Sequence, residues 1–284
     1  MPGHQCFMKP EYDNVVEMED DIEEELCDDK TKEDEDILKY IFFDFETTQE
    51  DQVQCEDGYQ PDEQQTCMNC KKKRCGSFEH IPNHCVAQRV CLSCMHQPLN
   101  EHTGCNICGK HQHKFGGRNT RDEFCKWLFS KENNNAIVMA HNFRAFDSWF
   151  VLSYLHENNV KPNIISNGAK NMCIQVEECN IKMIDSLNFL PAPLSMLPKM
   201  FGLHELCKGY FPHYFNKVEN EHAYLPGLPD IRFYNTEGMK QEERKKFYEW
   251  YEANKNTTFD FQKEIFKYCQ SDVDILRRCC LAFR

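Results

Sequence analysis

A short apolar run that contains two acidic residues constrains the fold of this chain more than any other feature. Residues 41–48 read Ile-Phe-Phe-Asp-Phe-Glu-Thr-Thr, and the apolar lead-in predicts a buried strand. Because side chains alternate along a strand, Asp44 and Glu46 point the same way, about 7 Å apart. Two adjacent carboxylates repel each other unless a cation lies between them. The pair is therefore a candidate site for Mg²⁺ or Mn²⁺, although such a pair at a strand end is more often simply solvated.

The negative charge of the chain is concentrated near its N-terminus. The 284 residues carry a formal net charge of −13, yet residues 11–36 hold 15 of the 46 acidic residues and only two of the 33 Lys and Arg. The rest of the chain is neutral, so nucleic acid is not excluded as a partner. The acidic run predicts a disordered tail over residues 1–36, either a solubilising segment or an interaction arm that mimics DNA.

The sequence predicts an intracellular protein with no membrane partner. No stretch is apolar enough to cross a bilayer, and the N-terminus is acidic where a signal peptide needs basic and apolar segments. Eighteen cysteines without such a signal favour metal binding and buried thiols over disulfides.

Strand-like and helix-like segments alternate along residues 37–284, which predicts an α/β fold with a mixed sheet. Strands are expected at 37–43, 85–90, 136–140, 172–176 and 181–184. Helices are expected at 121–130, 146–157, 194–201 and 260–283. The segment 191–238 is expected to consist mainly of loops apart from its short helix.

Further acidic residues follow two of these segments. Asp147 opens the helix after strand 136–140, a position that also suits ordinary helix capping. Tyr268 and Asp272 are four residues apart on the last helix and share a face. Asp274 points about 160° away from Asp272 and is expected to be a surface charge.

These positions together form a candidate two-metal site. Four carboxylates can hold two divalent ions about 3.5–4 Å apart, the arrangement that serves phosphoryl transfer. The phenol of Tyr268 would orient the attacking water. The four carboxylates are Asp44, Glu46, Asp147 and Asp272.

The order of these motifs resembles the 3′–5′ exonuclease domain of family B DNA polymerases, the DEDDy type on a ribonuclease-H-like fold. The resemblance is closest to the protein-primed subgroup found in phages, viruses and Maverick/Polinton transposons. It extends over residues 37–284, and its motifs occur in the family's order. The matching segments are 44–48, 141–147, 185–191, 208–210 and 268–272.

The resemblance implies a role for each matching residue. The four carboxylates would bind two Mg²⁺ or Mn²⁺ ions, and Lys208 would stabilise charge on the scissile phosphate. Phe146 would stack on a base, although core packing is an equally good explanation from sequence alone. Ala145 replaces a glycine of transposon-type relatives, which could alter the turn that presents Asp147. The residues expected to hold a single-stranded DNA 3′ end are Thr47, Asn142, Phe146, Ser186 and Leu187.

The polymerase motifs of the family are missing, since the chain contains neither Ser-Leu-Tyr-Pro nor Asp-Thr-Asp. We therefore expect an N-terminal exonuclease portion that lacks palm, fingers and thumb, cannot synthesise DNA alone, and has a polymerase domain or terminal protein as partner. Two alternatives stay open: a free-standing DEDD nuclease acting on RNA or DNA, and a degenerate remnant that binds DNA or protein without catalysis. Nuclear residence would suit a transposon polymerase, but no clear import signal supports it.

A Cys- and His-rich segment is predicted to form a zinc-binding insert over residues 55–118. Cys91-x₂-Cys94 and Cys105-x₂-Cys108 have the spacing of a closed, structural Zn²⁺ site. A second Zn²⁺ site is suggested by Cys67 and Cys70, with further ligands from Cys75 and either His80 or His84. The thiols expected to bind no metal are Cys85, Cys173, Cys179, Cys269, Cys279 and Cys280.

Overall fold

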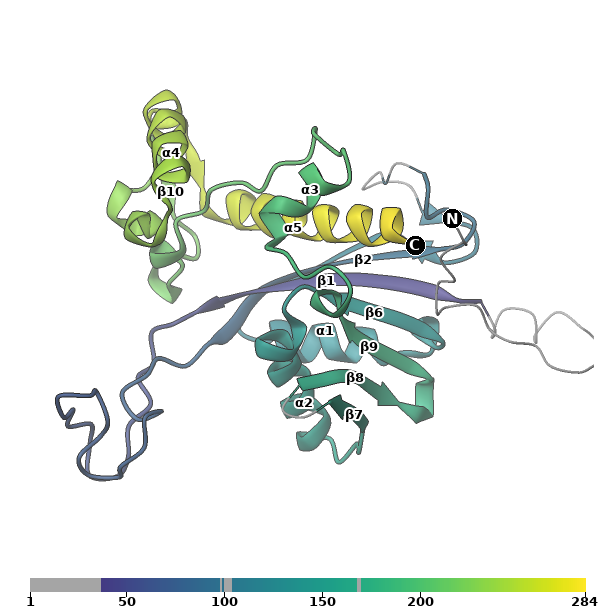
Figure 1. Ribbon diagram of the computed structural model, residues 1–284, viewed down its shortest axis with the longest axis horizontal. Helices are drawn as coiled ribbons and strands as arrows, with labels where there is room; N and C mark the ends of the chain where they lie inside the picture. Colours follow the sequence, from purple (N-terminus) through teal and green to yellow (C-terminus); the bar gives the residue numbers. More distant parts are fainter. Residues whose placement is uncertain (1–36, 98, 100–103, 168–169) are drawn as a thin grey trace, which may run out of the picture.

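The computed structural model describes residues 37–97, 99, 104–167 and 170–284, so the predicted acidic tail lies outside the described residues. A mixed seven-stranded sheet forms the centre, in the order β5-β2-β1-β6-β9-β8-β7 (Figure 1). β1 is antiparallel to β2 and parallel to β6, which is parallel to β9. The remaining pairs of neighbours in the sheet are antiparallel. Its strands are β1 (Lys39–Thr48), β2 (Ile81–Cys91), β5 (Gln112–Gly116), β6 (Ala136–Ala140), β7 (Asn163–Asn167), β8 (Lys170–Val176) and β9 (Ile181–Asp185).

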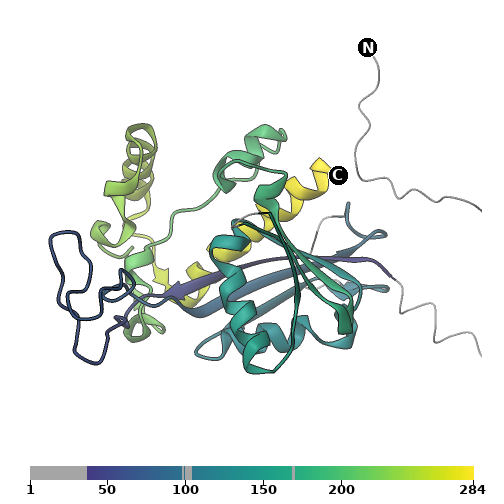
Figure 2. The same cartoon turned by 60° about the horizontal axis from the view of Figure 1, so that its bottom comes forward.

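Helices cover both faces of this sheet (Figure 1), and the turned view of Figure 2 shows the same layers. On one face lie α1 (Thr120–Leu128) and α2 (Asp147–Glu157). The other face carries α3 (Leu197–Met200) and α5 (Phe261–Phe283). Beyond the sheet lie α4 (Gln241–Asn254) and the short pair β10 (Tyr224–Leu225) with β11 (Phe259–Asp260), while β3 (Gly104–Cys105) and β4 (Gly109–Lys110) form a separate hairpin.

The alternation of β1 places its residues in two different cores. Ile41, Phe43 and Phe45 pack with α1 and α2 in one cluster of buried side chains. Tyr40 and Phe42 pack with α5 in a second cluster on the opposite face. Because side chains alternate with a period of two, the acidic residues that follow Phe42 continue the face that α5 covers.

The predicted α/β class and mixed sheet are confirmed, and every predicted strand and helix is present in some form. The sequence did not predict β5, β7 or α4. The helix predicted at 194–201 is shorter, because residues 194–196 form a 3₁₀ turn before α3, and Gly202 ends it with φ of 69°. Among the described residues, no helix is long and apolar enough to span a bilayer.

The predicted insert over 55–118 is corrected by the sheet, because β2 and β5 fall inside that range and pair with the main sheet. The two cysteine groups are therefore separate: one lies in the connection 49–80, and the other in the connection 92–111 together with Cys91, the last residue of β2. The strand predicted at 85–90 is the main part of β2, and its polar residues are buried because they bind partners on other elements. Gln88 donates to Gln112 (2.9 Å) and accepts from Arg277 (2.7 Å), and Arg89 donates to Asn133 (2.6 Å).

Asp274, predicted to be a surface charge, is partly exposed but also binds neighbouring side chains. Its carboxylate is half-buried and accepts hydrogen bonds from Gln88 Nε2 (2.9 Å) and Arg277 (3.3 Å). It thus joins α5 to β2, and helical pitch still directs it away from Asp272.

Candidate active site and metal centres

Four predicted carboxylates converge where β1 passes the carboxyl end of β6. Parallel pairing with β6 stops at Phe42, so Asp44 and Glu46 project beyond it. Asp147 stands at the first position of α2, and Asp272 comes from the middle of α5. Carboxylate oxygens of Asp44 and Glu46 lie within 4.8 Å of each other. The side chains of Glu46, Asp147 and Asp272 are buried, and that of Asp44 is half-buried.

Electrostatics show that these carboxylates act on one another. Burial and the charge of Asp272 raise the pKa of Asp44 to about 7. Burial raises the pKa of Glu46 well above its ordinary value, and Asp44, Asp272 and Asp147 raise it further. The pKa of Asp147 is raised by burial and by Asp44. Without a cation, the fold thus holds four acids that oppose each other's ionisation.

Two buried oxygens in this group lack a partner, and they fit a bound metal. Asp147 Oδ1 and Asp272 Oδ1 have no hydrogen-bond partner among the described residues. A buried carboxylate oxygen is costly to leave unpaired. An oxygen-only donor set with unpaired buried oxygens suits a hard divalent cation such as Mg²⁺ or Mn²⁺.

Lys208 is the basic side chain that faces this group. Its Nζ donates to Asp272 Oδ2 at 2.5 Å and lies 5.0 Å from the centre of the Tyr268 ring. Burial lowers the pKa of Lys208, but Tyr268 and Asp272 outweigh this and raise it above the ordinary value. Burial and Asp272 raise the pKa of Tyr268. Lys208 is therefore charged and the Tyr268 phenol stays protonated at neutral pH.

Cys269 of α5 reaches the same site. Its sulfur lies within 4.8 Å of the ligand oxygens of Asp44 and Glu46, and it donates to the Asp44 carbonyl oxygen at 3.3 Å. Burial and the charge of Asp44 raise the pKa of this thiol. Mg²⁺ and Mn²⁺ prefer oxygen ligands to sulfur, so the non-metal role of Cys269 stays a prediction.

Three of the residues predicted to hold DNA are accessible. Thr47 is half-buried, and its Oγ1 lies 2.9 Å from His80 Nδ1. Asn142 is exposed in the left-handed conformation with φ of 62°. Phe146 is half-buried, and its ring packs edge to face against the His80 ring with the ring centres 5.2 Å apart.

The remaining two residues of that set are less free. Ser186 is 0 % exposed and its Oγ lies 2.8 Å from His141 Nδ1. It cannot contact DNA directly in this arrangement, and instead holds His141 in place. Leu187 is half-buried, and its N–H donates to Asp185 Oδ1 at 2.9 Å.

The sequence did not single out Arg144 or His213. The Arg144 N–H donates to Asp185 Oδ2 at 3.1 Å, which fixes the turn before Asp147. His213 Nδ1 lies 3.9 Å from Glu46 Oε2, although its side chain is 49 % exposed. Partial desolvation of the ring and the charge of Lys208 lower the pKa of His213. His213 comes from the loop region 191–238, where no periodic pattern indicates which side chain lies beside the carboxylates.

The predicted four-cysteine site at the end of β2 is assembled. Sulfur–sulfur distances are 3.8 Å for Cys91–Cys94, 3.8 Å for Cys91–Cys105 and 3.6 Å for Cys94–Cys108. Four sulfurs about 2.3 Å from a tetrahedral Zn²⁺ would be about 3.8 Å apart, far from the roughly 2 Å of a disulfide. Burial raises the pKa of Cys105, but the N–H groups of Cys108 and Ile107 outweigh this and lower it to about 7.

A second four-cysteine group lies in residues 49–80, and it differs from the prediction in one ligand. Cys55, rather than His80 or His84, joins Cys67, Cys70 and Cys75. Cys55 escaped notice because it stands alone, twelve residues before Cys67. The N–H groups of Cys70 and Gln60 lower the pKa of Cys67 to about 6.

Comparison with known proteins gives the family. Residues 129–284, just over half of the chain, match the family described as DNA polymerase type B, organellar and viral. The chain belongs to this family of DNA polymerases. The match confirms the resemblance to protein-primed type B polymerases, and it includes Asp147, Lys208, Tyr268 and Asp272. It begins after β1, β2 and both cysteine groups, which therefore lie outside the matched region.

Curated relatives are much longer than this polymerase-family chain. It is 32 % identical over 157 residues to a probable DNA polymerase of Ascobolus immersus, which covers 52 % of the chain and 13 % of the relative. It is 27 % identical over 157 residues to a probable DNA polymerase of Neurospora intermedia, a match that covers 52 % of this chain and 16 % of that relative. Phi29 DNA polymerase complexed with primer-template DNA is a structural neighbour with a TM-score of 0.45 and 16 % identity, covering 86 % of this chain and 30 % of that one.

Proposed function

We propose that this chain is the 3′–5′ exonuclease region of a protein-primed type B DNA polymerase, which removes nucleotides from a single-stranded DNA 3′ end. The observation that carries the proposal is the convergence of four carboxylates with two unpaired buried oxygens, on Asp147 and Asp272. The family of the chain supports DNA as the substrate. Polymerisation would require a palm domain, so a polymerase domain and a terminal protein are the proposed partners.

The residues of the site divide the work of hydrolysis. Asp44, Glu46, Asp147 and Asp272 would hold two Mg²⁺ or Mn²⁺ ions, which when bound supply a water of lowered pKa and stabilise the leaving oxygen. The protonated phenol of Tyr268 can donate a hydrogen bond that orients the water. The Lys208 ammonium, held beside Asp272, can stabilise charge that develops on the phosphate.

The strand order supports a ribonuclease-H-like fold for this region. Three antiparallel strands, β5-β2-β1, are followed by the parallel strands β6 and β9. The acids come from the interior strand β1, from the helix after β6 and from the last helix. This is the placement that the resemblance to DEDDy exonucleases implies.

Zinc is proposed at the cysteine group that closes β2, where four thiols leave no open position for catalysis. Cys91, Cys94 and Cys108 are part of the hydrophobic cluster under α5. Zn²⁺ there would join the β3–β4 hairpin to the end of β2, which is a structural role.

The test is degradation of a 5′-labelled single-stranded DNA with Mg²⁺. We expect a ladder that shortens from the 3′ end, and its loss in the Asp44→Ala/Glu46→Ala variant. The matched control is Glu177→Ala/Glu178→Ala, which removes two exposed acids from the opposite end of β9. Absence of cleavage by a folded, zinc-loaded native chain would contradict an autonomous nuclease and favour a binding remnant.

A further inference from the structure

The connection between β1 and β2 is folded without an apolar core. Residues 49–80, the dark blue loops at the end of β1 in Figures 1 and 2, are called the finger below. The finger contains no helix, and its only strand-like pairing is the isolated bridges Gln52–Phe78 and Pro61–Cys67. Cys67 and Cys75 are its only buried residues, and no finger residue belongs to a hydrophobic cluster. A segment with so little apolar burial needs another source of folding free energy.

The two buried cysteines belong to one four-sulfur group that can supply that free energy. The sulfurs of Cys55, Cys67, Cys70 and Cys75 lie within 4.8 Å of one another, and Cys55 and Cys67 are 3.8 Å apart. The base of the finger is closed by hydrogen bonds from Val53 N–H to Ser77 (2.8 Å) and from Gly76 N–H to Val53 (2.7 Å). Four thiols at this separation match a tetrahedral Zn²⁺ site, and binding to such a site is folding free energy.

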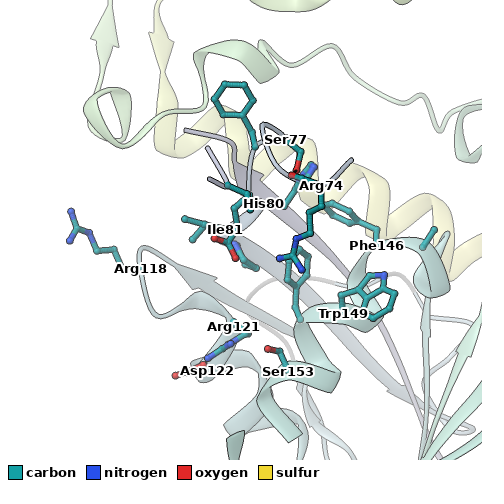
Figure 3. A pocket seen from close by; sticks show the side chains of 16 residues that line it. Arg74, Ser77, His80, Ile81, Arg118, Arg121, Asp122, Phe146, Trp149 and Ser153 are labelled. Carbon is teal, nitrogen blue, oxygen red and sulfur yellow. Dashed lines mark hydrogen bonds and ion pairs between the residues drawn. The ribbon is translucent and has the colours of Figure 1, made fainter. Parts of the chain in front are cut away.

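A cavity of about 750 Å³ lies between the finger and the start of α2 (Figure 3). This volume is within the range of ligand sites in proteins. From the finger come Arg74, Ser77 and Phe78, and from α2 comes Trp149. Phe78 is 52 % and Trp149 64 % exposed, so two aromatic rings on different walls are open to a ligand.

The charges around the cavity leave Arg74 as the available cation. Figure 3 shows its guanidinium directed inward, whereas that of Arg118 points away. Arg121 is already paired with Asp122 (2.7 Å) and Glu157 (2.6 Å). No ion pair of Arg74 occurs among the described residues. The cavity also contains Glu79, so its charge is mixed and phosphate contact depends on Arg74.

The cavity adjoins the carboxylate site. His80 of the finger contacts Thr47, which follows Glu46, and Phe146, which precedes Asp147. A DNA strand with its 3′ end at the carboxylates would therefore have its preceding nucleotides beside the finger.

We propose that the finger binds a second structural Zn²⁺ through its four cysteines and forms, with α2, a site for the single-stranded DNA that leads to the carboxylates. Bases stack on the rings of Phe78 and Trp149, and Arg74 contacts a phosphate. The part of this proposal that concerns the path of the strand rests on the proposed exonuclease function, whereas zinc binding and DNA binding do not.

Metal content of the purified full chain tests the zinc site. We expect two Zn²⁺ per native chain by elemental analysis, and one in both Cys67→Ser/Cys70→Ser and Cys91→Ser/Cys94→Ser. A native chain with one Zn²⁺ that is lost only in the second variant would overturn the site, as would iron in place of zinc. This readout does not depend on nuclease activity.

Binding of a fluorescent oligothymidylate tests the DNA site, measured by anisotropy without Mg²⁺ in the Asp44→Ala/Glu46→Ala background to prevent cleavage. Phe78→Ala is expected to weaken binding about tenfold. Arg74→Ala is expected to weaken binding about fivefold and to reduce its dependence on salt. The controls should leave it unchanged: Met68→Ala, an exposed finger residue outside the cavity, and Lys161→Ala, an exposed charge beyond the far end of α2.

The proposal fails if Arg74→Ala and Phe78→Ala bind like the parent while zinc-loaded and folded, or if duplex DNA competes as well as the single strand. A native chain that binds oligothymidylate through these residues but yields no 3′ ladder contradicts the exonuclease function alone. The two failures are therefore distinguishable.

Discussion

The carboxylate site and the finger both gather ligands that repel one another when ionised, but the fold supports them in opposite ways. Asp44 and Glu46 extend from a strand whose neighbours pack in two hydrophobic clusters, so they stay together without a metal. The finger buries only Cys67 and Cys75, so its geometry depends on what its sulfurs bind. The proposed site for catalytic metal is thus held under electrostatic strain by the fold, whereas the proposed structural metal would support the fold around it.

The largest effect expected from this contrast is in Glu46→Gln. Cleavage should fall by about 10³-fold or more because a metal ligand and its charge are lost. In the absence of divalent ions the variant should be more stable by about 1 kcal/mol near neutral pH, because folding of the native chain must bury the Glu46 charge or take up a proton there, and Gln requires neither. Rate assays and denaturant unfolding in EDTA-free, Mg²⁺-free buffer measure the two changes. Glu177→Gln is the control, because Glu177 is exposed. If this variant gains the same stability, the carboxylate site is not under electrostatic strain.

The second prediction separates the two cysteine groups. Cys94 packs in the hydrophobic cluster under α5, so Cys94→Ser should lower the free energy of global unfolding by about 3 kcal/mol through the lost metal. Cys67→Ser should change global unfolding by less than about 0.5 kcal/mol, while making residues 49–80 sensitive to protease. Denaturant titration with limited proteolysis checks both values. An equal loss of unfolding free energy in the two variants would show that the finger unfolds together with the core.

The same contrast explains what the sequence could predict. Asp44 and Glu46 were found because alternation on a strand is a local rule, and Tyr268 and Asp272 because four residues make one helical turn. The strand β2 was predicted over 85–90 but not over 81–84, because Pro82 and Asn83 are typical of a loop until the pairing of this segment with β1 is known. That pairing depends on another element, so no local pattern contains it.

The cysteine groups show a similar limit. The spacing of Cys91, Cys94, Cys105 and Cys108 predicted one complete site, because both pairs lie close in sequence. Cys55 joins the other group only through the return of the chain that brings Val53 to Ser77. His213 reaches Glu46 from an irregular segment in the same way. Loop contacts of this kind depend on tertiary structure and leave no periodic signal.

The third prediction concerns Lys208, whose positive charge offsets the repulsion among the carboxylates. Lys208→Met should slow cleavage about 10²-fold at saturating Mg²⁺, because the charge beside Asp272 and the phosphate is lost. Lys208→Arg keeps the charge and should recover part of the rate. Single-turnover rates at several Mg²⁺ concentrations measure the change. A normal rate in Lys208→Met would reduce Lys208 to a partner that only balances Asp272 in the metal-free fold.

The smallest effect is expected at Tyr268, which belongs to both kinds of region. Its ring is part of a hydrophobic cluster and stacks on Phe211 at 5.3 Å, while its phenol lies in the carboxylate site. Tyr268→Phe keeps the ring, so unfolding should change by less than about 0.5 kcal/mol. Cleavage should fall about tenfold, because a hydrogen bond that orients the water is lost.

The matched control for this change is Tyr251→Phe, which removes a phenol that donates to the Pro229 carbonyl oxygen at 3.1 Å. That variant should lose about 1 kcal/mol of stability and no activity. Both substitutions delete a phenol oxygen. A cleavage assay should show a slower rate only for Tyr268→Phe, and a thermal unfolding assay should show lower stability only for Tyr251→Phe. If Tyr268→Phe instead loses stability and keeps its cleavage rate, the phenol of Tyr268 stabilises the fold and takes no part in catalysis. Tyr268 would then belong with the supporting core, and Asp272 with the strained carboxylate site.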